Sequence, residues 1–221
     1  MSTQTTPALV AGEVEEVETP ATVPFYLPRD IGTAYLRLAE GRFTAADFEI
    51  FAAANPDLRL EMNKAGEMIV MMAAGPVSSN RNGKLTARLF NWAEVDDTGL
   101  AFDSSAGFKL PNGAERSPAA SWIRHERWQA LTPEEQETFW PLCPDFVVEL
   151  RSRTDSLKAT QAKMEEYMEN GAQLGWLIDP LKKKVHIYRP TAPIEILNNP
   201  SEISGEPLLK GFVLKLAGII D

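Results

Sequence analysis

Residues 145–179, DFVVELRSRTDSLKATQAKMEEYMENGAQLGWLID, decide the fold of this chain. They begin with a short, β-rich and mostly apolar run, which is typical of a buried strand. A helix follows, in which Leu157, Met164 and Met168 mark the face toward the core and Gly171 is placed to end it. A second apolar run, QLGWLID, completes a strand–helix–strand unit, and such units build parallel strand pairs.

Hairpin and helix patterns surround this unit. Residues 58–72, LRLEMNKAGEMIVMM, predict a hairpin that turns at 63–66. Residues 100–123, LAFDSSAGFKLPNGAERSPAASWI, predict two short strands joined around Pro111-Asn112-Gly113. Further helices are expected after a Thr44 cap, within 78–95 and after Thr132, with Asp155 expected to cap the helix of the central unit. The sequence therefore predicts an α/β fold with a mixed β-sheet flanked by helices.

Two segments differ in composition from this core. Residues 1–22 are rich in Thr, Ala, Pro and Glu and have no periodic apolar face, so we interpret them as a disordered acidic leader. From about Thr191 the chain carries Pro193, Pro200 and Pro207, which favours loops and short edge strands. We expect residues 23–221 to form a single domain.

Charge and cysteine content limit the functions that the chain can have. The formal net charge is −9, and four of the excess negatives are glutamates of the leader, which leaves −5 for the rest. A broad basic DNA-binding face is therefore not expected, and contact with nucleic acid must be local, metal-assisted or shared across an oligomer. No apolar run is long enough to cross a bilayer, and the N-terminal residues have no basic segment followed by an apolar one, so we expect no secretory signal. The single cysteine, Cys143, fits the reducing cytoplasm.

The stretch CPDFVVELRS, residues 143–152, looks most like a catalytic motif. Asp145 and Glu149 face the same side of one strand, but four strand residues span about 13 Å. One magnesium ion cannot bridge that distance, because its ligands lie at about 2.0–2.1 Å from it. Arg151 could bind a phosphate but cannot act as a base. The carboxylate that partners Glu149 must therefore come from an adjacent strand.

The adjacent strand is expected to be ERSPAASWI, residues 115–123, where Ala119 follows Pro118. From about Phe43 to the C-terminus the chain resembles the Uma2 family, predicted endonucleases with the restriction-endonuclease-like PD-(D/E)xK fold. The resemblance rests on several strings taken together: LEMNKAGEMIVM, FDSSAGFKLPNGAERSPAASWI, PLCPDFVVELRS, KMEEYMENGAQLGWLIDP and VHIYRP. In that family the residue after the proline is typically a metal-binding aspartate, and this chain has alanine there.

The resemblance implies roles for further residues. Glu149 matches the second acid, Lys163 and Tyr167 match a displaced lysine pattern on the next helix, and Glu61 matches an acid near the first hairpin. If the site is active, Glu149, Glu61 and the Leu150 carbonyl would hold Mg²⁺ or Mn²⁺, weakly because Ala119 supplies no ligand. Gln161 could hydrogen-bond within the site.

Each role has a plainer alternative at this stage. Glu149 could form a structural ion pair, Glu61 and Lys163 could face solvent, and Gln161 could bond to backbone groups. The expected function is cleavage of nucleic acid, with DNA as the expected substrate, by a homodimer. A weakened or inactive natural site, an engineered loss of the aspartate, a non-catalytic binding or assembly protein, and a hydrolase of small phosphate esters all remain open.

Overall fold

The predicted strand–helix–strand unit forms the centre of the computed structural model. It consists of β8 (Phe146–Leu150), α5 (Leu157–Glu169) and β9 (Leu174–Asp179). The two strands pair in parallel, with Phe146 opposite Leu174 and Leu150 opposite Ile178. The prediction of a parallel pair joined by a helix is confirmed.

The structure describes residues 33–38, 40–71 and 74–221. The predicted acidic leader, 1–22, lies outside these residues. Within the described ranges, no helix has both the length and the apolar character needed to cross a bilayer.

β8 and β9 lie in the middle of a six-stranded sheet with the order β11-β10-β9-β8-β7-β4. Its other strands are β4 (Gly99–Asp103), β7 (Ala120–Arg124), β10 (Lys184–Tyr188) and β11 (Glu195–Asn198). Every pair except β8–β9 is antiparallel. The sheet is mixed, as the sequence predicts.

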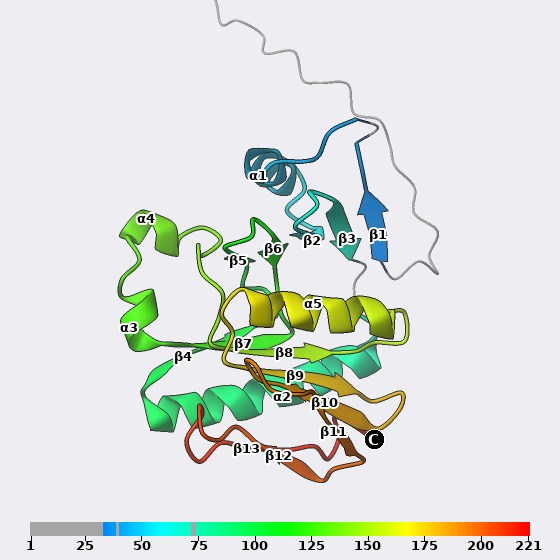
Figure 1. The fold of residues 1–221 in the computed structure, drawn as a ribbon, viewed down its shortest axis with the longest axis vertical. Helices are drawn as coiled ribbons and strands as arrows, with labels where there is room; N and C mark the ends of the chain where they lie inside the picture. Colours follow the sequence, from blue (N-terminus) through cyan, green and yellow to red (C-terminus); the bar gives the residue numbers. More distant parts are fainter. Residues whose placement is uncertain (1–32, 39, 72–73) are drawn as a thin grey trace, which may run out of the picture.

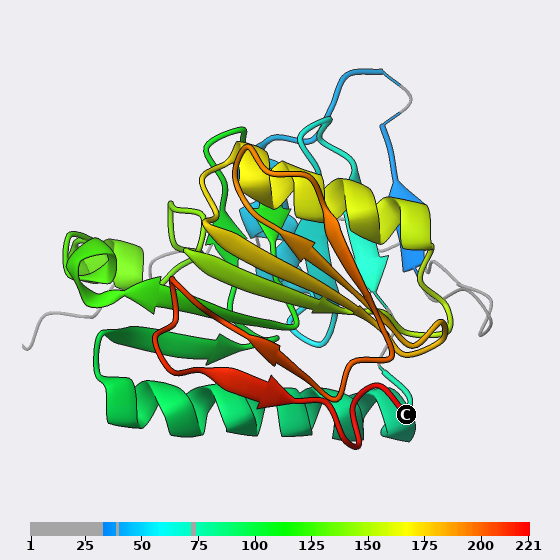
Figure 2. The same ribbon diagram turned by 60° about the horizontal axis from the view of Figure 1, so that its bottom comes forward.

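Two helices cover opposite faces of this sheet: α5 lies on one side and α2 (Pro76–Asp96) on the other (Figures 1 and 2). The alternation along β8 follows from this arrangement. Phe146 and Val148 pack in the core that includes α2, whereas Val147 packs in the core that includes α5. Glu149, two residues after Val147, therefore faces α5.

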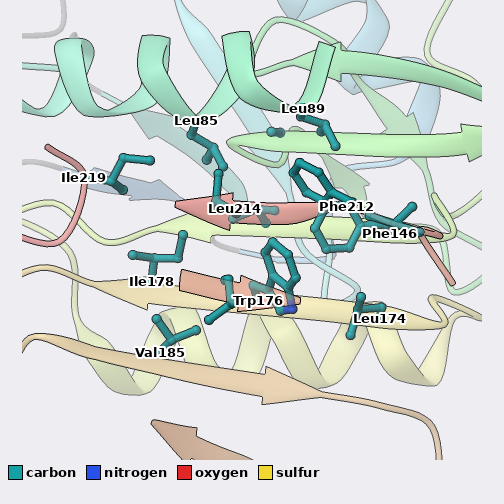
Figure 3. Packing of buried hydrophobic residues seen from close by; sticks show 14 of the residues in the cluster. Leu85, Leu89, Phe146, Leu174, Trp176, Ile178, Val185, Phe212, Leu214 and Ile219 are labelled. Atoms are coloured by element: carbon teal, nitrogen blue, oxygen red, sulfur yellow. The ribbon is translucent and has the colours of Figure 1, made fainter. Parts of the chain in front are cut away.

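The C-terminal segment completes the core on the α2 side. It adds the short strands β12 (Glu202–Ser204) and β13 (Val213–Lys215), which confirms the expectation of short strands after residue 191. In Figure 3, Leu85 and Leu89 of α2 approach Phe212 and Leu214. The sequence did not indicate that this tail would be so deeply buried, because its prolines interrupt the apolar pattern.

A second, five-stranded antiparallel sheet lies on the α5 side of the molecule (Figure 1). Its order is β1 (Thr33–Leu36), β3 (Met68–Met71), β2 (Arg59–Met62), β6 (Glu115–Arg116) and β5 (Phe108–Lys109). The predicted hairpin over 58–72 is confirmed as β2–β3, and Gly66 takes a φ of 73° in its turn. α1 (Ala45–Ala54) belongs to the same part of the fold, since Phe48 packs with residues of β2 and β3.

The prediction of two strands over 100–123 was wrong, since the segment forms four. β5 and β6 pair with each other around the Asn112-Gly113 turn, but they belong to the second sheet. β4 and β7, on either side of them, pair in the six-stranded sheet. The chain thus leaves one sheet for a short hairpin and returns, which strand propensity alone does not reveal.

Local capping signals agree with most predicted helix starts. Thr44 and Thr132 both form capping boxes, at α1 and at α4 (Pro133–Gln136), and a short α3 (His125–Trp128) precedes the latter. The Asp155 cap was wrong: Ser156 caps α5, while the Asp155 carboxylate accepts a bond from the Ser152 amide at 2.7 Å. Both residues suit a cap, and the chain uses the second.

Candidate active site

The candidate site lies where the chain passes from the second sheet into the six-stranded sheet. Residues Ser117, Pro118 and Ala119 make this passage, between β6 and β7. α5 lies beside it, with Lys163, Glu166 and Tyr167 at helical spacings of three and four, which place them on one face. Acids and bases from both sheets and from α5 meet here.

Glu149 reaches the site from β8. Its side chain is 12% exposed, and one of its oxygens lies 2.7 Å from the Lys163 ammonium. The Tyr167 hydroxyl donates a hydrogen bond to the same oxygen at 3.2 Å. Two groups of α5 thus hold the Glu149 carboxylate in one orientation.

Glu61 reaches the same place from β2, in the second sheet. It is 2% exposed and accepts bonds from Lys163 at 2.6 Å, from Arg116 at 3.1 Å and from the Ser117 amide at 3.0 Å. These three donors compensate the cost of burying its charge. Lys163 therefore bridges Glu61 and Glu149, one carboxylate from each sheet.

Arg116 connects Glu61 to a third carboxylate, that of Glu166. Its side chain donates to Glu61 and, at 2.6 Å, to Glu166 of α5. Asn112 also donates to Glu166, at 3.1 Å. The site is therefore a buried network of three glutamates, one arginine and one lysine.

Ala119 lies just outside the β7–β8 ladder, close to Glu149. Ala120, the next residue, pairs with Val148, the neighbour of Glu149. Ala119 itself is partly buried against the core on the α2 side of the sheet. An aspartate at 119 would bring a carboxylate into the neighbourhood of Glu149, whereas alanine offers no oxygen.

Burial and the two cations have opposing effects on the carboxylates. Burial raises the pKa of Glu61, but Lys163 and Arg116 outweigh it and hold the pKa below its usual value. The pKa of Glu149 is raised, by burial and by the nearby Glu61 charge, against the opposing effect of Lys163. Glu61 is thus the more strongly ionised carboxylate, and Glu149 is the one closer to accepting a proton.

The α5 groups are fixed in their protonated forms. Burial lowers the pKa of Lys163, but Glu149 and Glu61 outweigh it and leave the pKa raised. Burial also raises the pKa of Tyr167 well above its usual value, and the two glutamates add to this effect. Lys163 therefore remains a cation and Tyr167 a hydrogen-bond donor near neutral pH, so neither is a base in this arrangement.

Two cavities meet at this network. The first, of about 810 Å³, is lined by Glu61, Arg116 and the outer residues of α5. The second, of about 610 Å³, extends past Ala119 toward the beginning of α2. Both include Glu149, Leu150 and Lys163. A substrate in either cavity would therefore reach the bridged carboxylates.

The residues present fit a divalent cation only in part. Glu61 and Glu149 lie close enough to share one cation, since both contact the same Lys163 ammonium. That ammonium already neutralises them, and Ala119 contributes no third oxygen. In the part of the chain that the structure describes, no three His, Cys, Asp or Glu side chains come together as a metal site.

Comparison with known proteins gives one family match. Residues 45–217 match Uma2, a family described as "Putative restriction endonuclease". The chain belongs to the Uma2 family. No curated protein matches it.

A solved structure supports the fold. A crystal structure described as a putative nuclease belonging to DUF820, from Anabaena variabilis, superposes with a TM-score of 0.62 at 19% sequence identity. The match covers 73% of this chain and 89% of that protein. The Uma2 chain thus has a nuclease-like fold, as the sequence predicts.

Three residues considered from the sequence lie outside the network of this Uma2 protein. Asp145 precedes β8, at the opposite end of the strand from Glu149, where it accepts a bond from the Arg124 amide and pairs with Arg127 at 3.1 Å. Arg151 pairs with Asp179 at 2.8 Å. Gln161 is half-buried on α5 and is not among the residues lining either cavity.

Sequence reasoning missed Arg116 and Glu166. A signal for Glu166 existed, because it lies three residues after Lys163 and one before Tyr167, on the same helical face. Arg116 stands in the RSP string, but its strand is only two residues long. Its partners come from β2 and α5, and no local pattern predicts such contacts.

Glu115, beside Arg116 in the Uma2 chain, lies outside the network and gives a pH-dependent prediction. Its side chain is 2% exposed, its Oε2 atom has no partner among the described residues, and burial raises its pKa from 4.5 to about 7. Because the pKa of Glu115 is higher in the folded than in the unfolded protein, the protonated carboxyl favours folding. This contribution to stability is fully present below pH 4.5 and is lost as the pH rises through 7.

The Glu115→Gln variant should therefore be more stable than the wild type by about 3 kcal/mol at pH 8, and nearly equal to it at pH 4. Chemical denaturation at both pH values measures the difference. A gain of the same size at both would contradict the assigned cause, since the titration contributes only at the higher pH.

Proposed function

We propose that this protein is a nuclease that hydrolyses phosphodiester bonds of DNA, with activity weakened by Ala119. One observation carries the proposal: Glu61 and Glu149 converge on Lys163 where two cavities meet, directly beside Ala119. Family membership and the nuclease-like fold support a nuclease. The substrate, the cation and the reduced rate are our proposals.

Glu149, Glu61 and the Leu150 backbone carbonyl would hold Mg²⁺ or Mn²⁺. When bound, such an ion polarises a phosphate and lowers the pKa of a water molecule. Binding would be weak, because the Lys163 ammonium competes for both carboxylates and Ala119 supplies no oxygen. Hard divalent cations favour several oxygen ligands, and this site offers few.

The protein's own groups would act on the phosphate by charge and position. Lys163 remains a cation, so its ammonium would stabilise negative charge that develops on the phosphate oxygens. Tyr167 holds the Glu149 carboxylate, and Arg116 holds that of Glu61. Buried donors that need not reorganise during the reaction favour this kind of stabilisation.

A second candidate is a non-catalytic binding or assembly protein on the same fold. The paired state of Lys163 favours it, because an ammonium bonded to two carboxylates is less available to a substrate. Fold alone does not determine function. We infer in either case a homodimer, which suits the two strands of DNA, and a cytoplasmic location, which suits the buried Cys143.

A plasmid-nicking assay with Mn²⁺ tests the proposal. The wild type should nick supercoiled DNA slowly, and Lys163→Met should reduce the rate by about 100-fold, because it removes the cation beside the phosphate. Glu149→Gln, purified in parallel, should be similarly impaired. Equal nicking by all three proteins would identify a contaminating nuclease and contradict the proposal, and no nicking even at high enzyme concentration would favour the second candidate.

A further inference from the structure

The second cavity, of about 610 Å³, differs in chemistry from the first. It leads from Glu149 and Lys163, past Ala119, to the N-terminus of α2. Hydroxyl side chains from five separate parts of the chain line it: Thr33, Ser78, Ser79, Ser104, Ser117, Ser152 and Thr154. Hydroxyls donate hydrogen bonds to phosphate oxygens, so this lining suits a chain of phosphates.

The charges of the two cavities have opposite signs. The ionisable residues that line only the second cavity are Arg59 and Arg153, both basic. Those that line only the first are four acids and two bases: Glu61, Glu165, Glu166, Glu169, Lys64 and Arg116. A polyanion would therefore be attracted to the second cavity and repelled from the first.

The beginning of α2 adds a positive end to the second cavity. α2 is 21 residues long, its N-cap is Gly75 with no side-chain bond, and its first turn contains no acid. Val77 and Ser78, in that first turn, line the cavity. Uncapped amides at the start of a long helix favour an anion.

Asn82, one turn further along α2, adds a polar side chain to the same cavity. It donates through Nδ2 to the Ser104 hydroxyl at 3.3 Å. Its Oδ1 atom is shielded from solvent and has no partner among the described residues.

We propose that the second cavity binds the backbone of the nucleic-acid strand on one side of the reacting phosphate, and that this strand runs from Lys163 toward the N-terminus of α2. The inference rests on the proposed nuclease function. A local contact of this kind is compatible with the acidic net charge of the chain. Val77 and Arg153 become positions that set affinity for the strand.

A pair of matched substitutions on one helix tests this inference. Val77, 65% exposed, lies at the cavity, and Val95, 86% exposed, lies near the far end of α2. Val77→Glu and Val95→Glu change the net charge equally. Binding of a short fluorescein-labelled single-stranded DNA is measured by fluorescence anisotropy, in EDTA and over a range of KCl concentrations.

Val77→Glu should raise the Kd by about five- to tenfold. It should also reduce the slope of log Kd against log[KCl] by about the amount that one phosphate contact contributes. Val95→Glu should change the Kd by less than about twofold. An acid in the first helical turn is favourable, so Val77→Glu should melt no lower than the wild type. Weaker binding without lower stability separates a binding role from a folding defect.

A second matched pair uses basic residues. Arg153→Gln, at the cavity, should weaken binding several-fold, whereas Lys182→Gln, on the exposed β9–β10 turn, should not. Equal Kd values within both pairs would overturn the inference while leaving the nuclease proposal in place. No DNA binding by the wild type, together with no nicking by any variant, would overturn both.

Discussion

Replacing Ala119 by aspartate is expected to raise the Mn²⁺-dependent nicking rate by about 100-fold or more. Ala119 directly precedes the β7–β8 ladder and lines the second cavity together with Glu149. An aspartate there would add the third carboxylate that Glu61 and Glu149 lack as a metal site. Losing even an outer partner of a metal ligand costs about 10–100-fold, and a direct ligand contributes at least as much.

The stability of Ala119→Asp should depend on the metal in a way that the wild type does not. Without metal, a third carboxylate beside Glu149 and Glu61 adds repulsion in a buried place, so the variant should melt lower in EDTA. Added Mn²⁺ should restore the melting temperature, because a ligand that binds only the folded state stabilises it. Differential scanning fluorimetry measures both effects.

Ala119→Asn is the matched control, since it has the same size and no charge. It should neither gain the nicking rate nor show the Mn²⁺-dependent shift. Adding Glu149→Gln to Ala119→Asp should remove the gain. If aspartate at 119 gives neither cleavage nor metal-dependent stabilisation, the idea that alanine interrupts an otherwise competent site is wrong.

The central part of the fold could be predicted because its signals are local. Strand, helix and strand over 145–179 follow from apolar runs, and the capping boxes at Thr44 and Thr132 are short-range motifs. The division of residues 100–123 between two sheets could not be predicted, because it depends on where β2 and β7 lie. The burial of Phe212 and Leu214 likewise depends on contact with α2.

The candidate site was predictable to a similar degree. Strand geometry indicated that Asp145 is too far from Glu149 to share a metal ion with it, and that a partner must come from the neighbouring strand. The pairing of β7 with β8 confirms which strand is the neighbour. The resemblance supplied Glu61, Lys163 and Tyr167, which the structure places together with Glu149. Their roles in catalysis stay predictions. Ion pairs between distant segments, such as that of Arg116, follow no sequence period.

The network also has a structural consequence. Arg116 and Glu61 belong to the second sheet, Glu149 to the six-stranded sheet, and Lys163 and Glu166 to α5. The same ion pairs that arrange the site therefore connect the two sheets through the helix. A change in this network should affect stability as well as activity, so both must be measured for every variant of the site.

Arg116→Met is expected to lower the free energy of unfolding by about 3–5 kcal/mol, because it leaves Glu61 and Glu166 buried without their shared cation. For a chain of this length that corresponds to a fall in Tm of about 10 °C. Arg189→Met removes an exposed ion pair with Glu195 and should cost less than about 1 kcal/mol.

Replacing Glu61 and Glu166 by glutamine in the Arg116→Met variant separates the cost of unpaired buried charge from the cost of lost packing. The triple variant Glu61→Gln, Arg116→Met, Glu166→Gln should regain much of the stability that Arg116→Met loses, because positions 61 and 166 then carry no charge, while Glu149 keeps Lys163. Urea denaturation of the wild type, Arg116→Met, Arg189→Met and the triple variant measures these differences in the free energy of unfolding. If the triple variant is no more stable than Arg116→Met, packing by the arginine side chain, rather than charge, connects the two sheets.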